Sequence, residues 1–392
     1  MRYFRVRLGS NNAQFEDGFK RGYVGVDYDV HEDLAPLLHG TPEDVFPRIK
    51  DKFRSFHPGN GEGSVGQCAG NIWYCTSYMA NGDVIFTKDA DGNFYHGLIS
   101  DNYQWTPGSE LQHQRPVQWS GFSIQKSQMS KGLSDSIDSP KTCIELLDEH
   151  LDELTDLIQK AETAHNAWKQ NIDGLIDDYA ARFEDIAPDE RYKWEIAHHF
   201  QQHWDLEADD FAAMLEKAIE TTGNLLMASN YYPHGMITGL AKSRPEVIRT
   251  SFRRLYDTND PVEDRVHDFR QFCAELTAQL HEEGTKHFQD DRSCSVYLAL
   301  HKPDEYALYM QSVFKDTCER LGYPYNPKRG GSRNLREWNT MLHAIAERLK
   351  AAEHQDLINR HEARLGNDTY RDQNHLMLAQ DIAYAVRNYL KD

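Results

Sequence analysis

Apolar and polar residues alternate along much of the first 125 positions of the chain, and this period of two predicts β-strands. The expected strands lie at residues 1–9 and 22–30, within residues 71–100 and around residues 117–124. Asn81-Gly82 and Asp91-Gly92 predict tight turns, since these residue types tolerate a positive φ angle. A helical spacing of apolar residues covers residues 42–56. Short strands joined by tight turns indicate a small β-barrel or a strongly curved sheet.

From residue 141 onward, apolar residues recur every three or four positions, which predicts helices. The expected helices cover residues 144–161, 175–183, 192–204, 211–219, 245–256, 262–283, 303–321, 335–352 and 374–390. In this half of the chain, only residues 293–300 (SCSVYLAL) have the composition of a strand. The Ser-rich residues 126–140 predict a linker, with Ser139 and Pro140 beginning the next helix.

The expected fold class is therefore α+β, with an N-terminal β-barrel followed by a mainly helical region. We expect four parts: a barrel domain at 1–125, a linker at 126–140, an acidic helical segment at 141–222 and a helical connector domain at 223–392. A chain of 392 residues is long enough for two or three domains with cores of their own.

Composition narrows the class of protein further. An aromatic content of 11% argues against a disordered chain. No apolar run is long enough for a membrane span, and the N-terminus lacks the apolar core of a signal peptide. The six cysteines form no CxxC pair, which is typical of reduced thiols. We therefore expect a cytoplasmic protein that does not associate with membranes.

The formal charge is −19 with histidine neutral, and such a total disfavours nucleic acid as a partner. The charge is unevenly distributed, because residues 141–224 carry −14 of it, residues 1–125 carry −4 and residues 225–392 carry −1. The total therefore does not exclude nucleic-acid binding by the N-terminal domain. We interpret the acidic helices as a solvated spacer that keeps DNA away from the connector.

No motif predicts a catalytic centre. The sequence has no GxxxxGK(S/T) phosphate loop, no GxGxxG after a strand and no nucleophile elbow. His199 and His203 lie one turn apart near Asp205, but the Glu that a zinc hydrolase helix places after its first His is missing. Residues 336–343 and 348–354 have the Arg-to-His spacing of some helical ribonucleases, which charged helices also show by chance. We expect no metal and no cofactor.

Aromatic side chains are the most informative feature of the expected barrel. Aromatic planes that line a small barrel can sandwich a base pulled out of a helix, while a few polar groups read its edge. About half of these side chains are expected to point into the core, because strand residues alternate between faces. The aromatic residues in question are Tyr3, Tyr23, Tyr28, Trp73, Tyr95, Tyr103, Trp105 and Trp119.

Residues 1–120 resemble the EVE/PUA-like modified-base reader domains at the N-termini of modification-dependent restriction proteins. The resemblance is carried by the stretches 3–34, 70–105 and 107–119. Within them stands the ordered set Trp73, Gly82-Asp83, Gly97, Tyr103, Pro107-Gly108, Arg115-Pro116-Val117 and Trp119. The chain departs from the family pattern at Gln112 and Gln114, where basic or proline residues are common.

Residues 220–392 resemble the helical region that precedes the AAA+ motor in McrB-type restriction GTPases. The matching stretches are 221–257, 290–324 and 378–390. No Walker A or Walker B segment follows them in this sequence. The resemblance is therefore compatible with the front part of a longer motor protein and with a separate protein that recruits a motor.

Together the resemblances imply a DNA-recognition module of a modification-dependent antiphage restriction system, without a catalytic centre of its own. Its partners would be duplex DNA carrying modified bases, an AAA+ GTPase motor and a nuclease. The implied ligand is a flipped base such as methylated or hydroxymethylated cytosine. The base-binding candidates are the aromatic residues Trp73, Tyr23, Tyr28 and Trp105, with Asp27 and Asn71 for the base edge. The phosphate-binding candidates are Arg5, Arg7, Lys20, Arg21 and Arg115.

Two other functions are compatible with the same sequence. The first is a PUA-like RNA-binding or nucleotide-sensing adaptor unrelated to restriction, because a fold does not determine a function. The second is a nuclease within residues 141–392 whose active site has no recognisable motif.

Overall fold

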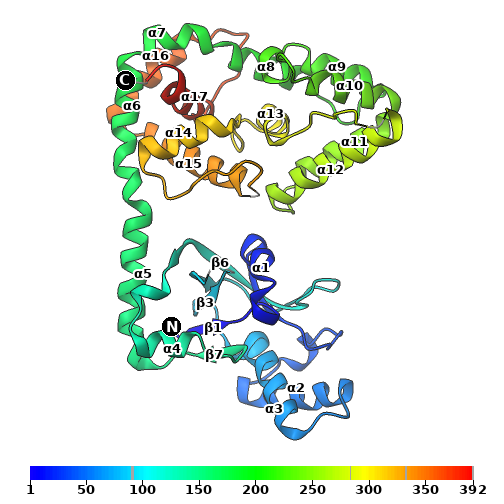
Figure 1. The fold of residues 1–392 in the computed structure, drawn as a ribbon, viewed down its shortest axis with the longest axis vertical. Helices are drawn as coiled ribbons and strands as arrows, with labels where there is room; N and C mark the ends of the chain where they lie inside the picture. The colour runs from blue at the N-terminus through cyan, green and yellow to red at the C-terminus, as the bar shows by residue number, and fades with distance from the viewer. Residues whose placement is uncertain (90–91, 283, 332, 391–392) are drawn as a thin grey trace. The chain divides into compact units, whose positions relative to one another are not determined.

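The computed structural model describes residues 1–89, 92–282, 284–331 and 333–390, and it divides the chain into two compact units, residues 1–165 and 166–392. The first unit combines a curled β-sheet with helices, and the described part of the second is helical apart from one isolated β-bridge, Ala228 to Tyr231 (Figure 1). The chain is therefore an α+β protein, as expected. Asp91, part of the second expected turn, lies outside the described residues.

A single mixed sheet forms the centre of the first unit. Its strands are β1 (Tyr3–Val6), β2 (Tyr23–Val26), β3 (Val84–Lys88), β4 (Phe94–Ile99), β5 (Gln104–Trp105), β6 (His113–Ile124) and β7 (Cys143–Glu145). The order is β2-β6-β4-β3-β1-β7, and β5 pairs with β6. Only the described pair β1 and β3 is parallel. The order has β2 and β7 at its two ends, so the sheet is curled and open rather than a closed barrel.

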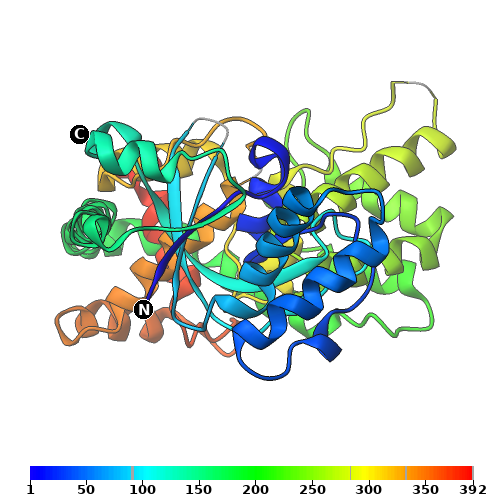
Figure 2. The ribbon, with the colours of Figure 1, turned by 90° about the horizontal axis from the view of Figure 1, so that it is seen from below.

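Helices cover both faces of this sheet (Figures 1 and 2). They are α1 (Phe15–Arg21), α2 (Pro42–Phe56), α3 (Glu62–Trp73), α4 (Lys131–Ile137) and α5 (Leu151–Asn166). Phe4 and Val6 of β1 face the core under α2 and α3, whereas Tyr3 packs in the core under α4 and α5. The strand is therefore buried on both faces, which its alternating sequence did not indicate.

The bounds of the helix α2 can be predicted from local sequence signals alone. Thr41 and Asp44 form a reciprocal capping box at its N-terminus, and Pro42 occupies the first turn. Val45, Ile49 and Phe53 recur every four residues on the face that is buried. The helix has the predicted bounds.

The expected strand structure at residues 71–78 is wrong. These residues finish α3 and continue as a π-helical turn, Tyr74–Tyr78. Ile72, Cys75 and Met79 are fully buried at spacings of three and four residues, so a helix brings all three to the core. The aromatic residues between them favour a strand by propensity, and tertiary packing overrides that preference.

The predicted linker at residues 126–140 is wrong as well. Residues 131–137 form α4, whose Leu133 and Ile137 are completely buried in the core under the sheet. The helix expected to begin at Pro140 is replaced by β7, which pairs antiparallel with β1. This Ser-rich segment contains one pair of apolar residues spaced four positions apart, Leu133 and Ile137. Burial of that pair packs the segment against the sheet.

The second unit consists of twelve further α-helices within its described residues. They are α6 (Ile172–Ala181), α7 (Phe183–Glu190), α8 (Tyr192–His203), α9 (Phe211–Ile219), α10 (Pro233–Ser243), α11 (Pro245–Tyr256), α12 (Val262–Leu280), α13 (Asp291–His301), α14 (Gln311–Leu321), α15 (Asn334–Leu349), α16 (Gln355–Arg364) and α17 (Leu376–Asn388). Over the described chain, no helix is both long and apolar enough to cross a membrane.

The strand expected at residues 293–300 is instead the interior of α13. Asp290 and Ser293 form a capping box at its N-terminus, and every residue from 293 to 300 is buried. A helix surrounded by other helices is apolar on all sides, so it loses the polar face that marks most helices in sequence. Short apolar runs of this kind do not distinguish a buried strand from a buried helix.

The acidic helices α6 to α9 share one hydrophobic core with α10 to α17. Some carboxylates of this segment, including Glu207 in the loop between α8 and α9, pair with basic residues of α10, α11, α14, α15 and α16. These ion pairs are Asp173–Arg348, Asp178–Arg320, Glu184–Arg360, Glu184–Arg364, Glu207–Arg253 and Glu216–Lys242. Residues 166–222 are thus part of a packed unit, and the interpretation of these helices as a solvated spacer is wrong.

Replacing Gly97 with alanine is expected to destabilise the first unit by about 1–3 kcal/mol, because the position is overpacked. A Cβ atom there would lie 2.6 Å from Val117 Cγ1 and 2.7 Å from the Gln118 carbonyl oxygen, next to a bulge between β4 and β6. Urea unfolding measures the effect. Gly70→Ala is the control, since nothing lies within 4 Å of that Cβ position in α3. Equal stability of both variants would contradict the close packing of β4 on β6.

Acidification is expected to weaken the second unit through His361. Burial lowers the pKa of this imidazole to about 4, whereas an unfolded chain has a histidine pKa of about 6.5. The unfolded state therefore binds the proton more tightly, and a contribution of about 3 kcal/mol present above pH ~6.5 is lost as the pH falls towards ~4. Urea unfolding at pH 7.5 and 4.5 should show a smaller pH effect in His361→Phe.

Asp372 opposes His361 over the same pH range. Burial raises the pKa of its carboxyl to about 7, so its contribution to stability is present at low pH and is lost as the pH rises from ~4 to ~7. The comparison with His361→Phe therefore requires the wild-type Asp372 in both proteins. The exposed His267 gives the control variant His267→Phe, which should keep the wild-type pH dependence.

Candidate functional site

The chain leaves β2 through residues 27–34, which we call the β2-exit loop. Tyr28 and Asp29 have φ angles of +83° and +54°, in the left-handed region. Such a conformation costs a residue other than glycine about 1–3 kcal/mol, and strained residues cluster at ligand-binding sites. The Asp27 carboxylate accepts a hydrogen bond of 2.8 Å from the Asp29 N–H. The rest of the first unit must hold this loop in place.

Tyr28 is the first anchor of the β2-exit loop. Its hydroxyl donates to Thr142 Oγ1 at 2.8 Å and accepts from Asn71 Nδ2 at 2.8 Å. Its carbonyl oxygen accepts from His57 Nε2, also at 2.8 Å. Burial raises the pKa of Tyr28 to about 12, so the hydroxyl keeps its proton. The Asn71 amide oxygen in turn accepts from the Cys143 N–H at 3.2 Å.

His113 and Tyr103 anchor the other end of the loop. His113 Nε2 donates to the Val30 carbonyl oxygen at 2.8 Å, and its Nδ1 accepts from the Tyr103 hydroxyl at 3.0 Å. The same hydroxyl oxygen accepts from the Leu34 N–H at 3.2 Å. Burial lowers the pKa of His113, which favours the neutral ring that this pair of contacts requires. Both ends of the loop are therefore held by side chains from distant parts of the sequence.

The anchored loop presents acceptors to solvent. Its solvent-accessible polar side chains are Asp27, Asp29, His31, Glu32 and Asp33. Trp105 lies nearby in β5, where it pairs with His113 of β6, and residues paired in this way share one face of a sheet. The indole is 36% exposed, which is unusual for a residue of this size. Such a surface can stack on a planar ring while carboxylates accept hydrogen bonds from amino groups.

Four of the six base-binding candidates lie in the β2-exit loop or are connected to it. Asp27 and Tyr28 belong to it, and Asn71 bonds directly to the Tyr28 hydroxyl. Trp105 is connected to it through His113. Tyr28 and Asn71 have their polar groups engaged with each other and with the protein, so they position the loop, whereas Asp27 and Trp105 remain accessible for a ligand.

Tyr23 and Trp73 are not part of this arrangement. Tyr23 is buried at the start of β2, and its hydroxyl donates to Asp17 of α1. The indole of Trp73 donates to the Pro42 carbonyl oxygen at 2.6 Å and packs against Tyr78, with ring centroids 4.5 Å apart. Both aromatic residues stabilise packing between elements. The prediction of a base contact is wrong for Tyr23, because it is buried, whereas Trp73 is half-buried and stays a predicted base contact.

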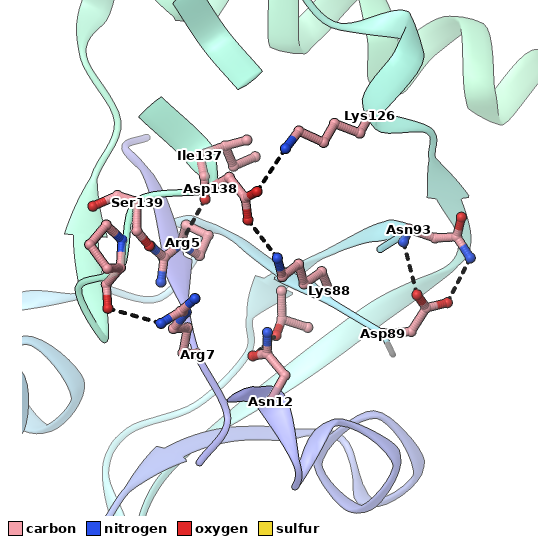
Figure 3. Close-up of polar contacts among 12 residues, drawn as sticks. Arg5, Arg7, Asn12, Lys88, Asp89, Asn93, Lys126, Ile137, Asp138 and Ser139 are labelled. Carbon is pink, nitrogen blue, oxygen red and sulfur yellow. Dashed lines mark hydrogen bonds and ion pairs between the residues drawn. The ribbon is translucent and has the colours of Figure 1, made fainter. Parts of the chain in front are cut away.

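Two of the five phosphate-binding candidates, Arg5 and Arg115, are buried and engaged within the protein. Arg5 is 2% exposed and donates to the Ile137 carbonyl oxygen at 2.9 Å (Figure 3). It also donates to the Lys141 carbonyl oxygen at 2.5 Å. Arg115 is 4% exposed and donates to the Met79 carbonyl oxygen at 2.6 Å. The prediction of phosphate contacts is wrong for both, because backbone carbonyl groups already bind these guanidinium groups.

Arg7, Lys20 and Arg21 lie nearer the surface, at opposite ends of β2. Arg7 donates through Nη1 to the Pro140 carbonyl oxygen at 3.0 Å (Figure 3). Its backbone N–H donates to the Thr142 carbonyl oxygen at 2.8 Å. It is therefore next to the residue that holds Tyr28. Lys20 and Arg21 end α1 just before β2 begins, and Arg21 Nε lies 3.0 Å from Asp17 Oδ1.

The residues that anchor the loop include several without any sequence signal. His57 and Thr142 lie in segments that were expected to be a helix end and a helix start, and nothing in their spacing connects them to residue 28. Tyr103 was recognisable as a barrel aromatic, but its role in holding the loop depends on His113. These contacts join positions up to 114 residues apart.

The motifs of the second unit are engaged in internal contacts. His199 Nε2 bonds the Lys217 carbonyl oxygen at 2.9 Å, and His203 Nδ1 bonds the His199 carbonyl oxygen at 2.8 Å. Arg348 and His354 converge on Asp173, at 2.5 and 2.9 Å.

Among the described residues, Asp173, Glu353 and His354 form one group that could hold a metal ion. The Arg348 guanidinium pairs with both of its carboxylates, which disfavours a second cation there.

Replacing Tyr28 with phenylalanine is expected to lower the free energy of unfolding by about 1–3 kcal/mol, because the buried amide of Asn71 and the hydroxyl of Thr142 lose their common partner. Urea unfolding measures the loss. Tyr232→Phe is the control, since that side chain is 52% exposed and its change should cost less than about 0.5 kcal/mol. If the two variants are equally stable, the Tyr28 hydroxyl does not hold the loop.

Comparison with known proteins provides no functional assignment for this chain. We found no match to this chain among protein-family models, curated proteins or solved structures. A functional proposal therefore rests on the β2-exit loop, on the exposed Trp105 beside it and on the sequence resemblance described above.

Proposed function

We propose that this chain is a DNA-recognition module of a modification-dependent antiphage restriction system, which binds duplex DNA and reads a flipped modified base such as methylated or hydroxymethylated cytosine. The observation that carries the proposal is the exposed indole of Trp105 beside a loop anchored at both ends and rich in carboxylates. The EVE/PUA-like resemblance of residues 1–120 supports the same function.

Stacking and hydrogen bonding would together offset the cost of flipping a base. Unstacking costs a few kcal/mol, and an aromatic platform returns about 1–3 kcal/mol per base. The carboxylate of Asp27 can accept from the exocyclic amino group of cytosine. Because Tyr28 and His113 already hold the loop, little conformational entropy is lost when the base enters.

Phosphate contacts must come from outside the loop, because its carboxylates repel the DNA backbone. Arg7 lies near the end of the loop that Tyr28 anchors, and Lys20 and Arg21 lie at the far end of β2. These three side chains remain the proposed phosphate contacts. With so few of them, affinity would depend more on the base than on the backbone, and its salt dependence would be modest.

The second unit would act as a connector to an AAA+ GTPase motor and a nuclease, either fused to this chain or separate from it. The resemblance of residues 220–392 to the region ahead of McrB-type motors supports this role. In this proposal the chain acts in the cytoplasm and carries no catalytic centre of its own.

The test is binding of fluorescent duplexes that differ only in one cytosine, which is unmodified, methylated or hydroxymethylated. The wild-type chain should prefer a modified duplex. Trp105→Ala should weaken binding of that duplex about 5- to 150-fold, the equivalent of 1–3 kcal/mol of stacking. Trp105→Phe should retain part of the affinity, because it keeps an aromatic plane.

Leu98→Ala is the matched control, since Leu98 is also a large exposed apolar residue of the first unit, at 43%. Equal and weak affinity for all duplexes would contradict base reading. Tighter binding of RNA of the same sequence would favour an RNA-binding adaptor. Cleavage of plasmid or phage DNA by the pure chain with Mg²⁺ would contradict the absence of a catalytic centre.

A further inference from the structure

A small cavity lies inside the second unit, between α8, α16 and α17. Its walls include Trp194 of α8, His361 of α16 and Asp381 of α17, together with Arg191 and Arg364. The space open to the centre of a water molecule is about 10 Å³. A cavity of this size holds about one water molecule, provided that polar groups are available to bind it.

Three buried nitrogen atoms in this wall have no hydrogen-bond partner among the described residues: Arg191 Nε, Trp194 Nε1 and His361 Nε2. Arg191 Nε forms an ion pair with Glu195 Oε1 at 3.2 Å, which leaves the two ring nitrogens without any polar partner among those residues. Trp194 is 2% exposed and His361 is 6% exposed, and their ring centroids are 4.8 Å apart. Leaving a buried polar group without a partner costs about 1–3 kcal/mol. Native proteins usually avoid this cost, so a shared partner between the two rings is expected.

The charged groups around the cavity already compensate one another. Arg191 pairs with Asp368 at 2.8 Å and, through Nε, with Glu195 at 3.2 Å, and Arg364 pairs with Glu184. Asp381 accepts from Lys193 at 2.6 Å and from Tyr179 at 2.6 Å. Among the described residues that line the cavity, no positive charge is left for an anion, and no carboxylate is left for a cation. The occupant should therefore be neutral.

The ring nitrogens of Trp194 and His361 determine which hydrogen bonds the occupant must make. An indole N–H is only a donor, so the occupant must accept a hydrogen bond from Trp194. Burial keeps His361 neutral by lowering its pKa to about 4, so this ring can accept a hydrogen bond in return. A water molecule can accept one bond and donate another, whereas a halide ion can only accept.

We propose that this cavity is a binding site for one water molecule, which accepts from Trp194 Nε1 and donates to His361 Nε2. The water connects α8 to α16 inside the core and satisfies both nitrogen atoms. The site is independent of nucleic-acid recognition, and its test needs no DNA.

The experiment records water-to-indole cross-relaxation in the full chain labelled with ¹⁵N-tryptophan. The Trp194 signal, assigned as the one missing from Trp194→Phe, should show a cross-peak to water. Trp338 is the internal control, since it is fully buried and its indole already donates to the Leu308 carbonyl oxygen at 3.2 Å. Its signal should show no such cross-peak.

Two variants of His361 test the second contact. His361→Leu should remove most of the Trp194 cross-peak, because the water loses its acceptor, whereas His361→Gln should keep it. Absence of the cross-peak in the wild-type chain would overturn the proposal, even if a variant fails to fold. An anomalous bromide peak in the cavity of crystals grown in bromide would also overturn it, because the occupant would then be an anion.

Discussion

The first unit depends on one buried guanidinium group, that of Arg5. It donates to the carbonyl oxygens of Ile137 and Lys141 and so holds the chain that leads into β7 against β1. That chain carries Thr142, which accepts from the Tyr28 hydroxyl and supports the strained conformation after β2. Burial lowers the pKa of Arg5 to about 10, so the charge persists at neutral pH and keeps the carbonyl groups in place. The conformation of the β2-exit loop therefore depends on Arg5, which lies outside the loop.

The rest of the first unit stabilises the strained conformation of the β2-exit loop at both ends of the loop. His57, Asn71 and Thr142 fix one end, and Tyr103 with His113 fixes the other. A loop held in this way presents its carboxylates in one arrangement before a ligand arrives, which is the property that selective binding of a small planar group requires. Trp105 contributes the apolar surface, and its exposure follows from its position in the two-residue strand β5.

The predictions succeeded where local signals agree and failed where packing decides. The helices at 42–56, 211–219 and 245–256 have the predicted bounds. Residues 293–300 form a helix and not the expected strand, because an apolar run buried on several sides loses the periodicity that separates a helix from a strand. Residues 71–78 are also helical, because packing overrides the strand propensity of their aromatic residues. Among the predicted base-binding residues of the candidate site, Asp27 and Trp105 are accessible to solvent. Tyr23, Trp73, Arg5 and Arg115 instead have internal partners.

The sequence by itself determined the α+β class, the order of most elements and the concentration of acidic residues in the middle of the chain, because these follow from neighbouring residues and from counting. Only the tertiary structure decided that the acidic helices pair with C-terminal arginines, and that two arginines of the first unit are buried. It also decided that Trp105 is the most exposed of the four aromatic base-binding candidates. The physical reason is that burial and hydrogen-bond partners depend on contacts between residues far apart in sequence, which local pattern does not encode.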